Sequence, residues 1–292
     1  MFSSYLYLVL TAAIWGFAFV AQRMGNAHLD PFLYNALRFA LGALCIGIVA
    51  LLSKQKQAVP RTGQRLRYSP LSLGLVLFIA SSLQQTGMLW TTAGAAGFIT
   101  GLYVVMVPLL GLFRGQKMQR LIWVSSVLAV AGLGLINDFS NLEASLGNAL
   151  VLLGAIFWAL HVQLVDKLRQ SYDTLELAFT QYAVTAALSL VATLVWNGIK
   201  APAYLISEAL LLNIGKAAGP ILYGGIFSVG IAFSLQAYAQ KRVAPARAAI
   251  ILCSEAVFAL FGGWLLLGEA VLLPMLIGSA LVGLAMLIAV RA

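Results

Sequence analysis

Ten apolar runs, each of a length that suits a lipid bilayer, occupy nearly the whole chain. They lie near residues 4–22, 32–52, 70–90, 93–113, 120–136, 146–164, 174–196, 217–239, 244–265 and 270–290. A membrane-spanning helix needs about 20 mainly apolar residues, because each residue rises about 1.5 Å through a hydrocarbon core about 30 Å thick. We therefore predict an all-α polytopic membrane protein with ten transmembrane helices.

The composition leaves little polar surface for contact with water. Of the 292 residues, 62% are hydrophobic and 9% are charged, whereas about a quarter of the residues in a soluble domain are charged. Ten spans leave no room for a separate soluble domain. We therefore expect neither an extramembrane catalytic domain nor a nucleic-acid partner, despite the net charge of +9.

The positions of the basic residues predict the orientation in the membrane. If the N-terminus is cytoplasmic, the outer loops hold Arg23, Lys200 and Lys216. The inner loops then hold thirteen basic residues, which are Lys54, Lys56, Arg61, Arg65, Arg67, Arg114, Lys117, Arg120, Lys167, Arg169, Lys241, Arg242 and Arg291. Because cytoplasmic loops are rich in Lys and Arg, we predict a bacterial inner (plasma) membrane protein with both termini in the cytoplasm.

The two halves of the chain resemble each other. A shift of 143 residues places Trp15 on Trp158 and Asp30 on Asp173. A shift of 152 places Ser82–Leu83–Gln84 on Ser234–Leu235–Gln236, Ala96 on Ala248, Ile99 on Ile251 and Gly111 on Gly263. These pairs predict two five-helix repeats, 1–140 and 144–292. Because five is odd, the second repeat enters the membrane from the opposite face, and inverted repeats of this kind are typical of transporters.

Local motifs in both halves are similar to those of a known family. They are Ile14–Trp15–Gly16, Asp30–Pro31, the segment 92–103, and Ser254–Glu255–Ala256–Val257 followed by Leu267–Gly268–Glu269. The chain thus resembles the drug/metabolite transporter superfamily, in its ten-helix EamA-type branch. The resemblance implies export of small metabolites or drugs through a central cavity lined by the first, third, fourth, sixth, eighth and ninth helices. Ala256 replaces the proline of the family's Glu-Pro-Val motif, which argues against a kink at this point.

Three charged residues fall inside predicted spans, Glu255, Arg38 and Arg247. Arg247 lies close to the cytoplasmic end of the ninth span, and we expect it to snorkel to the surface. A charge at the centre of a membrane helix costs about 2.5–3.5 kcal/mol on insertion scales, so it usually marks a function or a buried pair. Glu255, near the middle of the ninth span, is a candidate proton carrier or counter-charge for an amine. A helix-tying hydrogen bond or a pair with an arginine is the alternative. Arg38 is suited to bidentate binding of a substrate carboxylate, or else packs against neighbouring helices and snorkels outward.

Polar and aromatic residues at similar depth complete the predicted substrate site. Trp15 with Trp158 and Gln84 with Gln236 are repeat-related, which favours a shared role in the cavity. His161 changes charge near neutral pH if water reaches it; a histidine satisfied by a backbone carbonyl is the alternative. The predicted substrate-binding residues are Trp15, Arg38, Gln84, Gln85, Tyr103, Trp158, His161, Gln236, Tyr238 and Glu255.

Together these features predict a secondary transporter, working as an exporter of an amino acid or an amine by alternating access. A polytopic membrane enzyme or a lipid-carrier flippase is the alternative. With His28 and His161 as the only histidines, no nucleophilic or metal-ligand cluster forms, and no Walker loop is present. We therefore predict no enzymatic activity, no cofactor and no metal. The expected partners are a small-molecule substrate, the bilayer and, as a candidate coupling ion, the proton, in a monomer or a weak homodimer.

Overall fold

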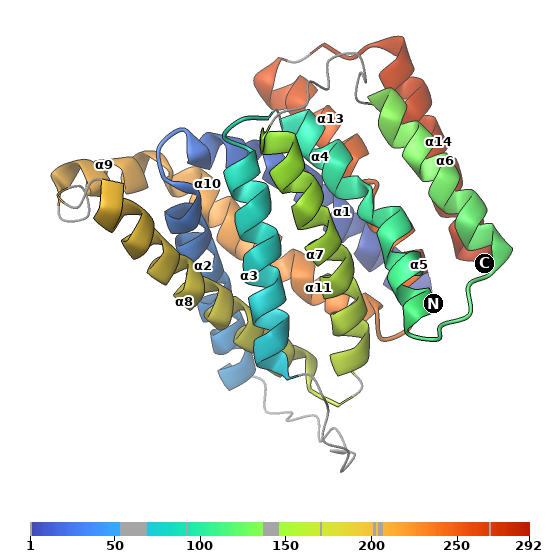
Figure 1. Cartoon of the computed structure of the whole chain (residues 1–292), viewed down its shortest axis with the longest axis horizontal. Helices are drawn as coiled ribbons and strands as arrows, with labels where there is room; N and C mark the ends of the chain where they lie inside the picture. Colours follow the sequence, from blue (N-terminus) through green and yellow to red (C-terminus); the bar gives the residue numbers. More distant parts are fainter. Residues whose placement is uncertain are drawn as a thin grey trace.

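The computed structural model describes residues 2–52, 69–91, 93–136, 146–169, 171–200, 203, 207–268 and 270–292, and within them it consists of helices joined by turns, with no strand. Figure 1 shows its helices, which are α1 (Phe2–Asn26), α2 (Pro31–Leu52), α3 (Pro70–Gly87), α4 (Ala93–Gly101), α5 (Tyr103–Phe113), α6 (Arg120–Ile136), α7 (Leu146–Leu168), α8 (Thr174–Lys200), α9 (Glu208–Lys216), α10 (Ala218–Leu222), the π-helix η3 (Tyr223–Ala232), α11 (Phe233–Ala239), α12 (Pro245–Leu252), α13 (Glu255–Leu267) and α14 (Leu273–Arg291).

Every predicted apolar run coincides with helix, but the number of spans is only partly established. Within the described residues, eight helical stretches are both long and apolar enough to cross a membrane, and α6 is a shorter apolar helix of 17 residues. The 18-residue α3 is not among the eight, because the polar residues Ser81, Ser82, Gln84 and Gln85 lower its hydropathy. The architecture is that of an all-α, multi-pass membrane protein, and ten crossings stay a prediction.

Two of the predicted spans are interrupted at matching positions in the two halves. The helix breaks at Leu102, between α4 and α5, and again at Cys253 and Ser254, between α12 and α13. A shift of 152 residues places Leu102 on Ser254. Although the missing proline at Ala256 put a kink in doubt, the helix is interrupted at this point. Ser254 supplies another reason for the break, because its side-chain hydroxyl donates to the Ile251 carbonyl at 2.7 Å and draws that carbonyl out of the regular ladder.

Two further features distinguish the second half from the first. The shift that aligns the halves grows from 143 to 152 residues, and the segment that contains the additional residues includes α9, a short helix with no buried residue. The predicted span 217–239 contains the ten-residue η3, which includes Gly224, Gly225 and Gly230, whereas its counterpart α3 is an ordinary α-helix. Extended π-helix is rare and often marks a functional region. The predicted boundary between the repeats, residues 140–144, lies outside the described residues, as do the basic residues 54–67 and Glu269.

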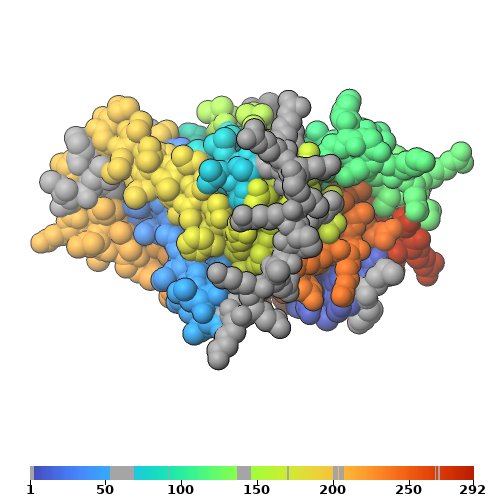
Figure 2. Space-filling model, turned by 90° about the horizontal axis from the view of Figure 1, so that it is seen from below, coloured from blue at the N-terminus to red at the C-terminus, as the bar shows by residue number. Residues whose placement is uncertain are grey.

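The helices pack in pairs that follow the two halves. The pair α6 and α14 lies at one edge of the molecule, and α2 and α8 pack together on the other side (Figure 1). Viewed from below in Figure 2, α8 and α9 (yellow) and the segment that leads into α6 (green) lie at opposite ends. The α6–α14 pair joins the fifth predicted span of each half, and the α2–α8 pair joins the second predicted span of each half. The pairing of α3 with α7 is likewise matched by that of α1 with η3 and α11.

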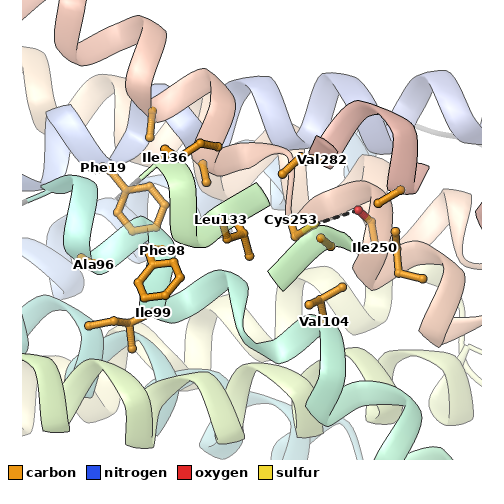
Figure 3. Close-up of a cluster of buried hydrophobic side chains, with 14 of the residues drawn as sticks. Phe19, Ala96, Phe98, Ile99, Val104, Leu133, Ile136, Ile250, Cys253 and Val282 are labelled. Atoms are coloured by element: carbon orange, nitrogen blue, oxygen red, sulfur yellow. Dashed lines mark hydrogen bonds between the residues drawn. The ribbon is translucent and has the colours of Figure 1, made fainter. Parts of the chain in front are cut away.

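The interior and the exterior are both apolar, as expected for a protein in lipid. Phe19, Phe98, Leu133 and Val282 belong to one buried cluster, which lies beside the break at Cys253 (Figure 3). On the outside, Leu51 is 87% and Phe113 is 90% exposed. Such side chains are stable on the surface only where the solvent is lipid.

Candidate functional site

A narrow cavity lies between the two halves, and residues next to both helix breaks line it. Its lining comes from α1, α2, α3, α4, α5, α7, η3, α11 and α13, which includes every helix that the family resemblance implies, with α2 in addition. The lining residues are Trp15, Phe19, Gln22, Arg38, Gln84, Thr100, Tyr103, Trp158, His161, Val162, Ser228, Gln236 and Glu255.

Glu255 and Tyr103 stand at equivalent positions at the two breaks. Each is the first residue of the second helical segment, α13 and α5 respectively, and each lines the cavity. Glu255 is 3% exposed. No basic side chain of the described residues forms a salt bridge with it, and neither its Oε1 atom nor the Tyr103 hydroxyl has a hydrogen-bond partner there. The Glu255 and Tyr103 side chains nevertheless interact with each other across the two breaks, and the Glu255 Oε1 atom stays available for a ligand.

Gln84 is the centre of a hydrogen-bonded network that joins four helices. Its Nε2 atom donates to Gln22 Oε1 at 3.1 Å. Its Oε1 atom accepts from Trp158 Nε1 at 2.8 Å and from the Thr100 hydroxyl at 3.3 Å. Both ends of this buried amide are therefore satisfied, and the network fixes α1, α3, α4 and α7 relative to one another.

The equivalent residues of the other half are arranged differently. Trp15, the counterpart of Trp158, donates to the backbone carbonyl of Ser228 in η3 at 3.1 Å, and not to Gln236. Gln236 is 1% exposed, and neither its Nε2 nor its Oε1 has a partner among the described residues. A buried amide without partners costs about 1–3 kcal/mol. Gln236 is thus an unsatisfied donor and acceptor on the cavity wall.

Aromatic rings surround Phe233, the first residue of α11. Its ring centroid lies 4.7 Å from that of Trp15, 5.9 Å from that of Trp158 and 5.7 Å from the His161 ring. His161 Nε2 is 2.8 Å from Gln181 Oε1, and Nδ1 has no partner in the described structure. With the Gln181 amide in this orientation, Nε2 donates and Nδ1 is an acceptor. The sequence suggests a backbone carbonyl as the alternative partner of His161, but the partner in the structure is the side chain of Gln181.

Arg38 is buried in α2 and does not snorkel to the surface. It is 3% exposed, and its Nε atom donates to Asn35 Oδ1 at 2.9 Å. Its guanidinium carbon lies 4.8 Å from the Phe39 ring centroid, which is a cation–π arrangement. These contacts hold the guanidinium at the edge of the cavity.

Eight of the ten predicted site residues meet at the cavity, and two do not. Gln85 points to α1, where its Nε2 donates to the Gln22 carbonyl at 3.1 Å and to Asn26 Oδ1 at 2.7 Å. Tyr238 is 44% exposed and packs edge-on against Tyr7. Neither lines the cavity, because neighbours on a helix point about 100° apart and only the fold decides which side faces inward.

Five lining residues were absent from the predicted set. Gln22, Thr100 and Ser228 take part in the hydrogen bonds described above, while Phe19 and Val162 supply apolar wall. Phe233 was also missed. The sequence does place Gln22 at a depth that suits the cavity, although it was not among the ten selected residues, whereas it gives no indication for the backbone carbonyl of Ser228.

A family model matches both halves of the chain, at residues 2–138 and 145–291, and its description is the EamA-like transporter family. The protein belongs to the EamA-like transporter family. Two matches to one model agree with the duplication seen in the sequence. As a member of a transporter family, the protein has a small-molecule substrate and works in a lipid bilayer.

Similar proteins span nearly the same length. The uncharacterized transporter YoaV of Bacillus subtilis (strain 168) is 22% identical over 94% of this chain and 92% of its own. An uncharacterized transporter of Archaeoglobus fulgidus is 26% identical over 96% of this chain and 83% of its own. A solved crystal structure with 18% identity matches 99% of this chain and 96% of its own with a TM-score of 0.77, which shows the common fold.

Proposed function

We propose that this EamA-family protein is a secondary transporter that exports a small molecule carrying a protonated amine, such as an amino acid or an amine. The observation that carries the proposal is the cavity at the two helix breaks, where Glu255 is buried and has no basic partner among the described residues. A buried carboxylate needs a cation or a proton. An ammonium group supplies the first, and proton coupling supplies the second.

The unpartnered atoms on the cavity wall favour a ligand with several donors. Glu255 Oε1, Gln236 Oε1 and His161 Nδ1 are acceptors without partners in the described part of the chain. An ammonium group has three N–H donors, and the rings around Phe233 add faces that attract a cation. Arg38 on α2 offers a positive charge for a carboxylate, so a zwitterion fits both charges of the cavity.

The two halves support a mechanism of alternating access by two inverted repeats. Trp158 is bonded to Gln84, whereas Trp15 is bonded to Ser228, and Gln236 has no partner among the described residues. If the halves exchange these arrangements, Trp15 pairs with Gln236, and Gln84 becomes the free amide. Exchange between two such states around one central site opens it to each side in turn, and each state keeps one glutamine available to the ligand.

Reconstitution in liposomes tests the proposal. Amines, amino acids and neutral polar compounds are offered to vesicles with and without the protein, under an imposed pH gradient. We expect protein-dependent movement of an amine or a zwitterion. Equal movement in both kinds of vesicle across the whole set would reject transport of these classes.

The role of the carboxylate is tested by Glu255→Gln. This change removes the ionisable group while it keeps the shape of the side chain, so we expect the protein to fold and transport to lose its dependence on pH between about pH 5 and 8. Glu208→Gln is the matched control, because Glu208 lies on α9, which has no buried residue. If Glu255→Gln transports with the same pH dependence as the unchanged protein, proton coupling at this carboxylate is rejected.

A further inference from the structure

A second hollow lies at the end of the molecule where the termini meet, separate from the central cavity. It is an open groove of about 470 Å³. Its walls are the connection between α5 and α6, the end of α7, the turn between α11 and α12, and the C-terminal residue Ala292. Figure 2 views the molecule from this end, with the α5–α6 connection in green and the C-terminus in red. The groove therefore joins segments from both halves of the chain.

The groove is strongly basic. Five cationic side chains line it, Lys117, Arg169, Lys241, Arg242 and Arg247, against one acidic side chain, Asp166. Asp166 is engaged by Arg169 at 2.7 Å. Even with a carboxylate counted at Ala292, positive charge remains in excess. Like charges repel when they are brought together in a hollow, so the cluster is most stable with an anion in place.

The backbone adds donors to the same groove. Helix α12 begins at Pro245 in its wall, and its N-cap residue Ala244 supplies no side-chain cap. The first N–H groups of a helix have no partner within the helix and attract negative charge. Beside them, Arg247 donates from Nη1 to the Tyr5 hydroxyl at 3.2 Å, while its buried Nε has no partner in the described structure. This guanidinium still has a donor to offer.

We propose that the groove is a binding site for a phosphate-bearing anion. Arginine and lysine with free backbone N–H groups are the donor set that phosphate oxygens require. The phosphate belongs either to an anionic phospholipid headgroup or to a soluble phosphate compound. Because Lys117 comes from the first half and Arg242 and Arg247 from the second, a bound phosphate holds the two halves together at this end. The proposal is independent of what the central cavity carries.

Thermal unfolding of the full chain in a neutral detergent tests the site. One arm compares potassium phosphate with potassium chloride at equal ionic strength. The other compares micelles containing phosphatidylglycerol with micelles containing phosphatidylcholine. We expect at least one arm to raise the unfolding midpoint by about 2–5 °C through binding to the folded state. A shift with free phosphate identifies a soluble ligand, and a shift with phosphatidylglycerol alone identifies a lipid headgroup.

Variants separate a built site from general attraction by charge. Arg247→Gln is expected to abolish the stabilisation. Because Arg247 also contacts Tyr5, the second variant is Lys117→Gln with Arg242→Gln, which replaces two exposed residues. The control is Arg120→Gln with Arg291→Gln, two exposed cations at the same end that do not line the groove. Absence of stabilisation in both arms, or an equal loss in the control, overturns the proposal.

Discussion

At the scale of single residues, the functional information lies where the two halves differ. Glu255 and Tyr103 occupy the same place in the two repeats, yet only one of them is a carboxylate. Gln84 and Gln236 are the same residue in the same place, yet within the described residues only Gln84 has hydrogen-bond partners. This pair shows that two identical side chains at equivalent positions can differ in hydrogen bonding within one conformation of the protein.

Substitution of the two glutamines by leucine is expected to have opposite effects. Gln84→Leu leaves Trp158 and Gln22 without a partner in a buried site, so we expect a loss of about 2–4 kcal/mol in the free energy of unfolding. Gln236→Leu removes an amide whose atoms already have no partners in the described structure, so stability is unchanged or raised while transport falls. Unfolding in detergent and uptake in liposomes measure the two effects. Equal destabilisation by both changes would contradict this account of the pair.

At the scale of elements, the two helix breaks and the close contact of α1 with α13 shape the cavity. Gly16 makes that contact possible. A Cβ atom at this position would lie 2.6 Å from the Glu255 carbonyl oxygen and 2.8 Å from the Ala259 nitrogen. The backbones can therefore approach only because residue 16 has no side chain. The contact falls at the first turn of α13, which places Glu255.

Gly16→Ala is expected to separate α1 from α13. The added Cβ would also meet Phe258 Cβ, and none of the three contacting atoms moves when a side chain changes its rotamer. We therefore expect a cost of about 1–3 kcal/mol in unfolding free energy together with reduced transport. Gly283→Ala in α14 is the control, since a Cβ atom added at this residue would meet no described atom within 4 Å and alanine favours helix. If Gly16→Ala unfolds and transports as the control does, the contact is not what positions Glu255.

At the scale of the whole molecule, α6 packs against α14 and α2 packs against α8, which is the pairing expected if the two predicted repeats are related by a two-fold axis. The sequence orientation makes the turn between α1 and α2 external and the connection between α5 and α6 cytoplasmic. Three predicted spans lie between these two sites. Of these three, α3 alone has a hydropathy too low to qualify as a membrane span by composition.

Labelling of single cysteines tests both orientation and crossing number. Ala27→Cys and Lys117→Cys replace exposed residues, in a background where Cys45 and Cys253 are changed to alanine. In intact cells, a membrane-impermeant maleimide is expected to label position 27, and to label position 117 only after permeabilisation. The reverse pattern would contradict the orientation. Labelling of both from the same side would show that one of the three segments, α3 first of all, does not cross.

The sequence by itself determined the helices and the family, and the two five-helix repeats stay a prediction. Apolar runs near 20 residues long leave the backbone no alternative to helix in lipid, because each N–H and C=O must be bonded within its own segment. Repeated motifs such as Ser82–Leu83–Gln84 and Ser234–Leu235–Gln236 can be read directly from the sequence. The rare intramembrane charges of Glu255 and Arg38 also stand out without a structure, because such groups are costly in lipid.

Only the tertiary structure decided which polar groups share the cavity. In lipid, apolar residues cover both the packed and the exposed faces of a helix, so periodicity does not show which face is inside. Hence Gln84 and Gln85 were indistinguishable until packing turned one toward the cavity and the other toward α1. The breaks before Tyr103 and Glu255, the π-helix register that brings Ser228 to Trp15, and the unpartnered amide of Gln236 in the described structure arise from contacts between helices that are far apart in sequence.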